Sequence, residues 1–442
     1  MLSFSFAFYY YRVSPSGILL PNDYRAFREG GGSGLPFLGE FCVLLCFGVF
    51  LLARGPESVM RRGLDSVAKA LFVLFAYGFV ISHVDPYGVS HYAVRGALRG
   101  SLLIPTIGYL VAANVPQNPL MRAVLVAGFL AGATVQTAAV VAPGFFPKEM
   151  LWGVQGPEIA TNPLTGENVL IESGRGLGFY ERSTPAGVCL LLHIALAYGA
   201  MVAYRREIVR FLLSGLILFF CYAVAKTIQR NVAVALVAMV LMVLLDIPRR
   251  IRSSGFRATI LLLLMTTVSF LAFPYVWGRF HGSLGEVYSN DYRSFLWPAY
   301  IGWLLENPMI LVSGAGFGVS AFSRAGQDLG LAHGHNQILT YFGYVGVPMT
   351  CLFCSVVAVV ALRAARALRD RSRKTSQLIW QRCMLLSVAA MGIMCIAEVP
   401  FNFSPAATLF FVFAGLSRGE SLGRGRLALV PVRTEASLEK TS

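Results

Sequence analysis

His335 is the residue of this chain best suited to move a proton. It stands in His333-Gly334-His335-Asn336-Gln337, where a long apolar stretch begins. Histidine titrates near neutral pH, so its neutral ring can accept the proton of an attacking hydroxyl. Alternatively, His335 is an ordinary packing or capping residue at the start of a helix. A metal site needs more ligands than two histidines, and no acidic residue lies at a fixed spacing from them.

Two arginines are candidates for binding a phosphate group. Arg293 opens an amphipathic stretch, and Arg230 stands at the turn between two apolar spans. The guanidinium group suits phosphate because its planar fork binds two oxygens and stays charged. Two plainer interpretations remain open. In the first, Arg293 is a surface residue that pairs with the nearby Asp291. In the second, Arg230 and Lys226 only extend their side chains to the membrane interface.

The composition indicates the elements that must position these residues. Of 442 residues, 56% are hydrophobic and 13% are charged, against about 25% charged in soluble domains. Apolar runs near the length that crosses a bilayer recur along the chain. They lie at about 37–53, 67–84, 101–114, 122–142, 185–204, 207–225, 231–247, 257–277, 335–362, 378–398 and 404–417. We therefore expect an all-α polytopic membrane protein, one membrane domain over 1–442, with about 11–12 transmembrane helices. Phe4–Leu20 is a candidate for the additional span.

Basic residues indicate how the spans are oriented. The net charge of +15 fits the lysine and arginine enrichment of cytoplasmic loops, so we expect no nucleic-acid partner. The basic loop 363–377 and the tail 418–442 fall on one side, which we predict to be cytoplasmic. Two long loops, 143–184 and 278–334, fall on the other side. The second should carry a surface helix over Tyr292–Leu305.

Several motifs are absent from the sequence. There is no Asp-x-Asp pair to hold a cation on a nucleotide sugar and no Walker A motif for ATP. Most of the eight cysteines lie in apolar runs, where cysteine acts as a small hydrophobe. Cys351 and Cys354 have metal-like spacing but lack partners nearby. We therefore expect no metal and no cofactor.

An ordered set of residues runs from the head of the surface helix into the next span. It reads Arg293, Trp297, Trp303, Glu306-Asn307-Pro308, Ser313-Gly314-Ala315-Gly316-Phe317-Gly318, His335-Asn336-x-x-Leu339, Gly343 and Gly346. This set, over about 290–346, resembles the signature of the O-antigen ligase and O-antigen polymerase superfamily. In that family an arginine-led surface helix ends in Asn-Pro-x-x-Gly-x-Gly. Here five residues separate Pro308 from Gly314 instead of two.

The resemblance implies a reaction and a site. Family members transfer a glycan from undecaprenyl pyrophosphate to an acceptor hydroxyl outside the bacterial inner membrane, without metal or nucleotide. His335 matches the catalytic histidine and Arg293 the arginine of the surface helix. Arg230 matches a pyrophosphate-binding arginine, although Gln229 and Asn231 replace the family's usual neighbours. The other residues implied are Arg175 and Arg182, as alternative pyrophosphate contacts, and Asn336, Gly316 and Gly318 in support.

The implied protein is a multi-pass inner-membrane enzyme with a periplasmic active face and a large periplasmic loop carrying short surface helices. Its expected partners are the lipid-linked donor, a glycan or lipid acceptor, the bilayer and other polysaccharide-export proteins.

We favour polymerisation of O-antigen or exopolysaccharide repeat units over ligation to lipid A–core. A transporter, or flippase, for the same lipid-linked glycan is the alternative of another class. Transporters often contain internal repeats, and the sequence shows none. A purely structural subunit of an export complex is a third interpretation.

Overall fold

The computed structural model describes residues 11–13, 19–21, 38–57, 64–83, 98–116, 118–146, 158–161, 168–171, 178, 180, 183–227, 229–246, 288–317, 335–370, 372 and 378–422. The side chains of Arg230 and of residues 288–295 are outside this description, although their backbones are included.

Among the described residues, six helices are long and apolar enough to cross a membrane. They are α5 (Ser66–His83), α8 (Pro119–Val141), α9 (Ser183–Ala203), α10 (Glu207–Lys226), α16 (Gln337–Arg369) and α17 (Ile379–Ala397). Two shorter apolar helices, α3 (Leu38–Arg54) and α11 (Arg230–Asp246), accompany them. The chain is therefore a helical, polytopic membrane protein, as the composition predicts.

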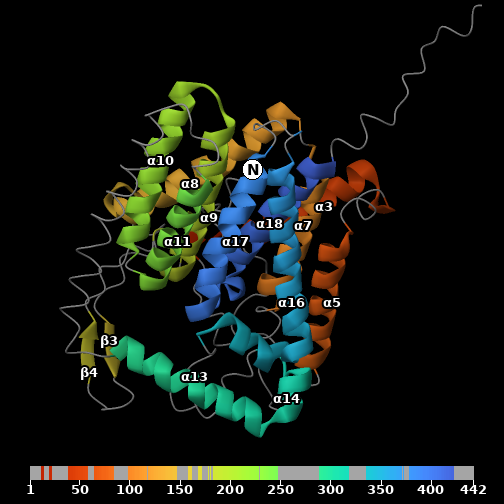
Figure 1. Cartoon of the computed structure of the whole chain (residues 1–442), viewed down its shortest axis with the longest axis vertical. Helices are drawn as coiled ribbons and strands as arrows, with labels where there is room; N and C mark the ends of the chain where they lie inside the picture. Colours follow the sequence, from red (N-terminus) through yellow and green to blue (C-terminus); the bar gives the residue numbers. More distant parts are fainter. Residues whose placement is uncertain are drawn as a thin grey trace, which may run out of the picture.

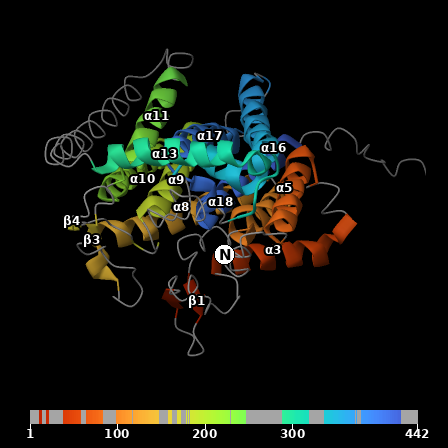
Figure 2. The same ribbon diagram turned by 90° about the horizontal axis from the view of Figure 1, so that it is seen from below.

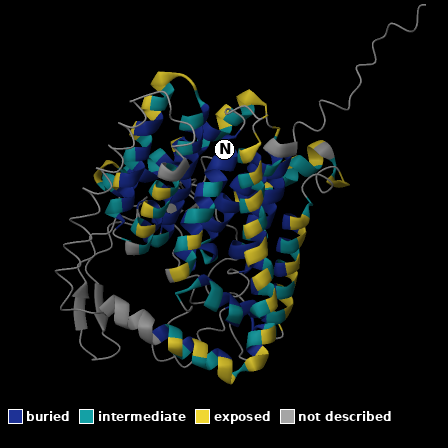
Figure 3. Cartoon of the chain, viewed as in Figure 1, coloured by how far each residue is buried: buried dark blue, intermediate teal, exposed yellow. Residues whose placement is uncertain are grey.

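The helices form a bundle whose centre is the most enclosed part (Figure 3). The π-helix η2 (Arg99–Leu103) continues into α7 (Ile104–Asn114), which packs along α18 (Ser404–Leu422). Helix α9 packs against α10 and α17. Large apolar side chains such as Val73, Phe211 and Leu362 are exposed on the outer helices. This surface suits lipid, because a bilayer solvates apolar side chains at no cost.

We name the two ends of the bundle after a residue at each. At the His335 end, α16 and α18 begin, and at the Asp65 end they finish. Helix α13 (Tyr288–Glu306) crosses the His335 end of the bundle and leads into the short α14 (Pro308–Ser313) beside α16 (Figures 1 and 2). A helix is thus present over the predicted stretch Tyr292–Leu305 and extends a few residues beyond it. Its place at the membrane surface stays a prediction.

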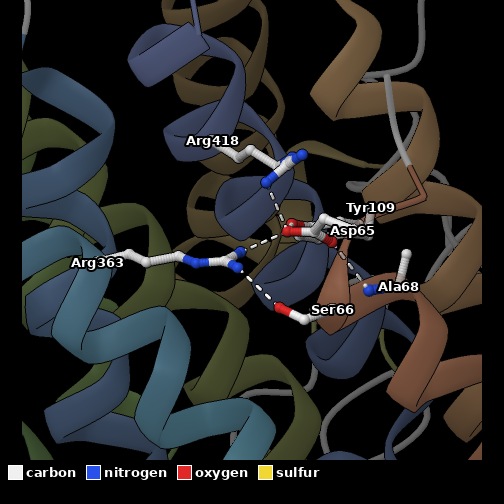
Figure 4. A network of polar contacts seen from close by, with 6 residues as sticks. All are labelled: Asp65, Ser66, Ala68, Tyr109, Arg363 and Arg418. Carbon is white, nitrogen blue, oxygen red and sulfur yellow. Dashed lines mark hydrogen bonds and ion pairs between the residues drawn. The ribbon is translucent and has the colours of Figure 1, made fainter. Parts of the chain in front are cut away.

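Polar contacts join helices at both ends. At the Asp65 end, one carboxylate caps α5 through Ala68 N and accepts hydrogen bonds from Tyr109, Arg363 and Arg418 (Figure 4). This network connects α5, α7, α16 and α18. At the His335 end, the buried carboxylate of Glu40 on α3 lies 3.1 Å from the Nε of Arg99, which begins η2.

The helices match the predicted spans to within a few residues, with one clear extension. Helix α16 continues through Arg363 to Arg369, beyond the predicted end at 362. Arginine favours helix, and Arg363 is tied to Asp65 and to Ser66. The predicted span 257–277 lies outside the described residues, so the total of about 11–12 spans stays a prediction.

The described strands form two short antiparallel hairpins, which the all-α prediction did not include. Strands β1 (Tyr11–Val13) and β2 (Leu19–Pro21) pair with each other, so Phe4–Leu20 is not one continuous transmembrane helix. Strands β3 (Glu158–Thr161) and β4 (Asn168–Ile171) pair within the predicted loop 143–184. The described single-turn helices are η3 (Pro143–Phe145) and η7 (Pro400–Asn402).

Candidate functional site

His335 lies immediately ahead of α16 in a strained backbone conformation. Its φ is +46°, the one positive φ of a non-glycine residue in the described part of the chain. Asn336 then caps α16, with its Oδ1 accepting hydrogen bonds from Ile338 N and Leu339 N, both at 3.0 Å. Left-handed backbone is costly for a residue with a side chain and gathers at functional sites. The cap therefore sets where α16 starts, and the histidine stands outside the helix.

Glu398 provides a carboxylate beside this histidine. The His335 Nδ1 lies 3.6 Å from Glu398 Oε2, and the two side chains are 23% and 10% exposed. Glu398 follows α17 in extended conformation, with its N–H donating to Met394 O at 2.8 Å. A carboxylate at one ring nitrogen orients an imidazole and stabilises the charge it gains on accepting a proton. At 3.6 Å the two groups are beyond hydrogen-bond range, and they form an ion pair when the ring is protonated.

Helix α11 begins at the same place. Asn231 Nδ2 donates to Glu398 Oε1 at 3.3 Å, and Gln229 Nε2 donates to Ser183 Oγ at 2.6 Å. Arg230 lies between these two residues in the chain. Its backbone is thus held at the His335 end, next to the residue that contacts Glu398. The structure therefore brings the position of Arg230 into the site, while its guanidinium group remains outside the described atoms.

Arg293 belongs to α13, the helix that crosses the His335 end (Figure 2). Its side chain is not described. The second half of α13 is anchored by the buried Tyr300, whose ring lies directly against Gly343 of α16. A side chain at Gly343 would collide with the Tyr300 hydroxyl. This contact explains how α13 is kept over the end of the bundle.

The glycine-rich turn after α14 joins α5 to α16. Gly316 N donates to Tyr344 O at 2.9 Å, and the next residue, Phe317, donates its N–H to Ser82 Oγ at 3.0 Å. Gly316 has φ +94°, and a Cβ there would lie 2.9 Å from the Ser82 Cα. Only glycine fits this close passage. Gly316 thus allows α5 and α16 to pack closely at this turn, and its supporting role in the site stays a prediction.

Helix α16 is broken where that turn meets it. Gly346 has φ 74° and ψ 170°, and Pro348 follows two residues later. Pro348 has no N–H, so the carbonyl of Tyr344 has no donor inside the helix and accepts from Gly316 instead. The carbonyl of Gly343 likewise accepts from Ala315 N at 2.9 Å. The segment from Gln337 to the break is thus a short half-helix, and His335 lies just before its cap residue, Asn336.

Three of the predicted site residues, Arg175, Arg182 and Gly318, lie outside the described residues, and their roles stay predictions. The next residue after Arg182, Ser183, begins α9 and contacts Gln229. In the part of the chain that the structure describes, no group of three His, Cys, Asp or Glu side chains is arranged to hold a metal ion.

Sequence reasoning did not select two residues of this site. No sequence pattern singles out Glu398, and Asn231 stands out only as an unusual neighbour of Arg230. Glu398 is 63 residues beyond His335 in the chain, so no short motif joins them. The available signal was an acidic residue at the end of an apolar span, because a charge at membrane depth is expensive unless it has a role.

Comparison with protein-family models and with curated proteins finds no match for this chain.

Proposed function

We propose that the protein is a metal-independent membrane glycosyltransferase. It transfers an undecaprenyl-pyrophosphate-linked glycan to an acceptor hydroxyl and polymerises O-antigen or exopolysaccharide repeat units. The main support is the placement of His335 beside Glu398, with the start of α11 in contact and α13 crossing the same end. This arrangement would place a base next to the two elements that carry Arg230 and Arg293.

The proposed chemistry is a direct displacement. The acceptor oxygen attacks the anomeric carbon, and His335 takes the proton of the hydroxyl. The bond between that carbon and the phosphate oxygen breaks, and undecaprenyl pyrophosphate leaves with the electron pair. Arg293, Arg230 and either Arg175 or Arg182 would stabilise the charge of the leaving group. Glu398 would orient the imidazole and stabilise it once protonated.

The proposed location is the bacterial inner membrane, with the His335 end facing the periplasm. The basic loop and the C-terminal tail, both predicted to be cytoplasmic, begin at Arg363 and Arg418. These two residues bind the same carboxylate, Asp65, at the opposite end. The proposed partners are the lipid-linked donor, a glycan or lipid acceptor and other polysaccharide-export proteins.

The test is to express His335→Ala and Arg293→Ala in a deletion strain and to examine the polysaccharide ladder. We expect chain length to be lost while single repeat units are retained, as for a polymerase. His83→Ala is the matched control, because His83 lies at the same end of the bundle, on α5, bonded to the Phe79 carbonyl of its own helix. It should give a wild-type ladder.

Other outcomes identify the alternatives. Free lipid-linked polymer, with none attached to lipid A–core, indicates a ligase. Repeat units that stay on the cytoplasmic face indicate a transporter. Wild-type ladders from both variants contradict the catalytic assignment.

A further inference from the structure

Gln337 is a fully buried amide two residues after His335. Both the oxygen and the nitrogen of its side-chain amide form hydrogen bonds with the turn η7. Its Oε1 accepts from Phe401 N at 3.0 Å, and its Nε2 donates to Asn402 Oδ1 at 3.2 Å. A buried amide destabilises a protein unless such partners are present, and an apolar side chain could have filled this volume. The presence of an amide here therefore indicates that its two hydrogen bonds serve to fix η7 relative to the start of α16.

Asn336 makes a second attachment on the other side of Glu398. Its Nδ2 donates to the carbonyl of Ile396 at 2.9 Å. The two residues after His335 thus bind the chain both before and after Glu398. The carboxylate lies within a short segment, 396–402, whose two ends are fixed to the start of α16.

We propose that Gln337 is a positioning residue that holds Glu398 against His335. This inference rests on the proposed function, because it assigns Gln337 to the same proton transfer. Gln337 would not touch the substrate. It would act by setting the separation of the imidazole and the carboxylate, which is 3.6 Å in this structure. Loss of its hydrogen bonds frees η7 and allows the carboxylate to move away from the ring.

A role in packing alone makes a different prediction. If Gln337 only joins α16 to the segment before α18, its loss lowers the amount of folded protein and leaves the turnover of each folded molecule unchanged. If it acts through Glu398, its loss lowers turnover. In addition, the effect disappears when the carboxylate has already been removed. Energetic coupling between two substitutions measures this dependence directly.

The experiment uses the full-length protein in proteoliposomes, with the lipid-linked glycan isolated from a deletion strain as substrate. Gln337→Met should lower kcat by about tenfold while KM stays within about twofold, because only an interaction of the transition state is lost. In a Glu398→Gln background, which retains part of the activity, Gln337→Met should lower kcat by less than about twofold further.

Gln381→Met is the matched control. Gln381 is also fully buried, and its Nε2 donates to Ser417 O at 3.0 Å near the Asp65 end. This variant should lose stability and keep its kcat. Asn402→Ala provides a second route if Gln337→Met does not fold. It removes the same side-chain contact from a partly exposed position, and it should lower kcat in the same direction.

The possible results separate the two proposals. If Glu398→Gln lowers kcat and Gln337→Met does not, the positioning role is wrong and the proposed function stands. The same conclusion follows if Gln337→Met costs equal factors in both backgrounds. If Glu398→Gln and His335→Ala both turn over at the wild-type rate, the catalytic assignment itself is wrong and the positioning role falls with it.

Discussion

At the scale of single residues, the carboxylate of Glu398 makes the most specific prediction. Its two oxygens face different partners, His335 Nδ1 at 3.6 Å and Asn231 Nδ2 at 3.3 Å. Glu398→Gln keeps the shape and can still accept from Asn231 through its amide oxygen. The neutral amide that then faces the histidine cannot stabilise the positive charge of the protonated ring, so the ring loses its charged partner.

We expect Glu398→Gln to lower turnover by about 10- to 100-fold, a part of the roughly 10²- to 10⁴-fold that a general base contributes. The rate of glycan transfer by purified protein checks this. Glu306→Gln is the control, because Glu306 is an exposed carboxylate at the end of α13 on the same end of the bundle. Equal rates for the two variants would remove Glu398 from the reaction.

At the scale of elements, the break in α16 separates the short half-helix that follows His335 from the rest of α16. Gly314, Gly316 and Gly346 gather at this break, where the turn after α14 supplies donors to carbonyls that the helix leaves free. The sequence predicts the helices on both sides and the glycine turn. It does not predict the break itself, because Gly346 and Pro348 are compatible with a kink, a cap or a continuous membrane helix. The contact with α14 selects among these.

Gly346→Ala tests this element. A Cβ at Gly346 would collide with the carbonyl oxygen of Val312, and φ is +74°. With ψ at 170°, this conformation is essentially restricted to glycine and costs a residue with a side chain about 1–3 kcal/mol, so the melting temperature of the detergent-solubilised protein should fall clearly. Gly392→Ala is the matched control, because nothing lies within 4 Å of that position in α17. It should be neutral or slightly stabilising. Equal melting temperatures for both variants would show that the break is not held by α14.

At the scale of the whole molecule, the predicted spans that fall on described residues agree with the helices, because apolar runs of membrane length have few alternatives in a bilayer. The arrangement of those helices was not predictable in the same way. Asp65 stands in a basic, solvent-near segment of the sequence, and its partners Tyr109, Arg363 and Arg418 lie on three other helices. Glu398 and Asn231 are similarly distant in sequence. The chemistry of each residue was visible, but its partner depends on how the bundle closes.

The Asp65 network should therefore support the bundle without taking part in the reaction. Its carboxylate is 6% exposed, while Arg363 and Arg418 are 38% and 21% exposed. Removal of one partner from a fully buried ion pair costs about 3–5 kcal/mol. Solvent screens these partly exposed arginines, so Asp65→Asn should destabilise the protein by about 1–2 kcal/mol. Thermal unfolding in detergent measures this, with Asp370→Asn as control, since that exposed carboxylate accepts hydrogen bonds from Ser372, two residues away in the chain. The rate of glycan transfer per folded molecule should be unchanged for Asp65→Asn, because the network lies at the opposite end from His335. A large loss of that rate at unchanged stability would show that the two ends of the bundle are coupled.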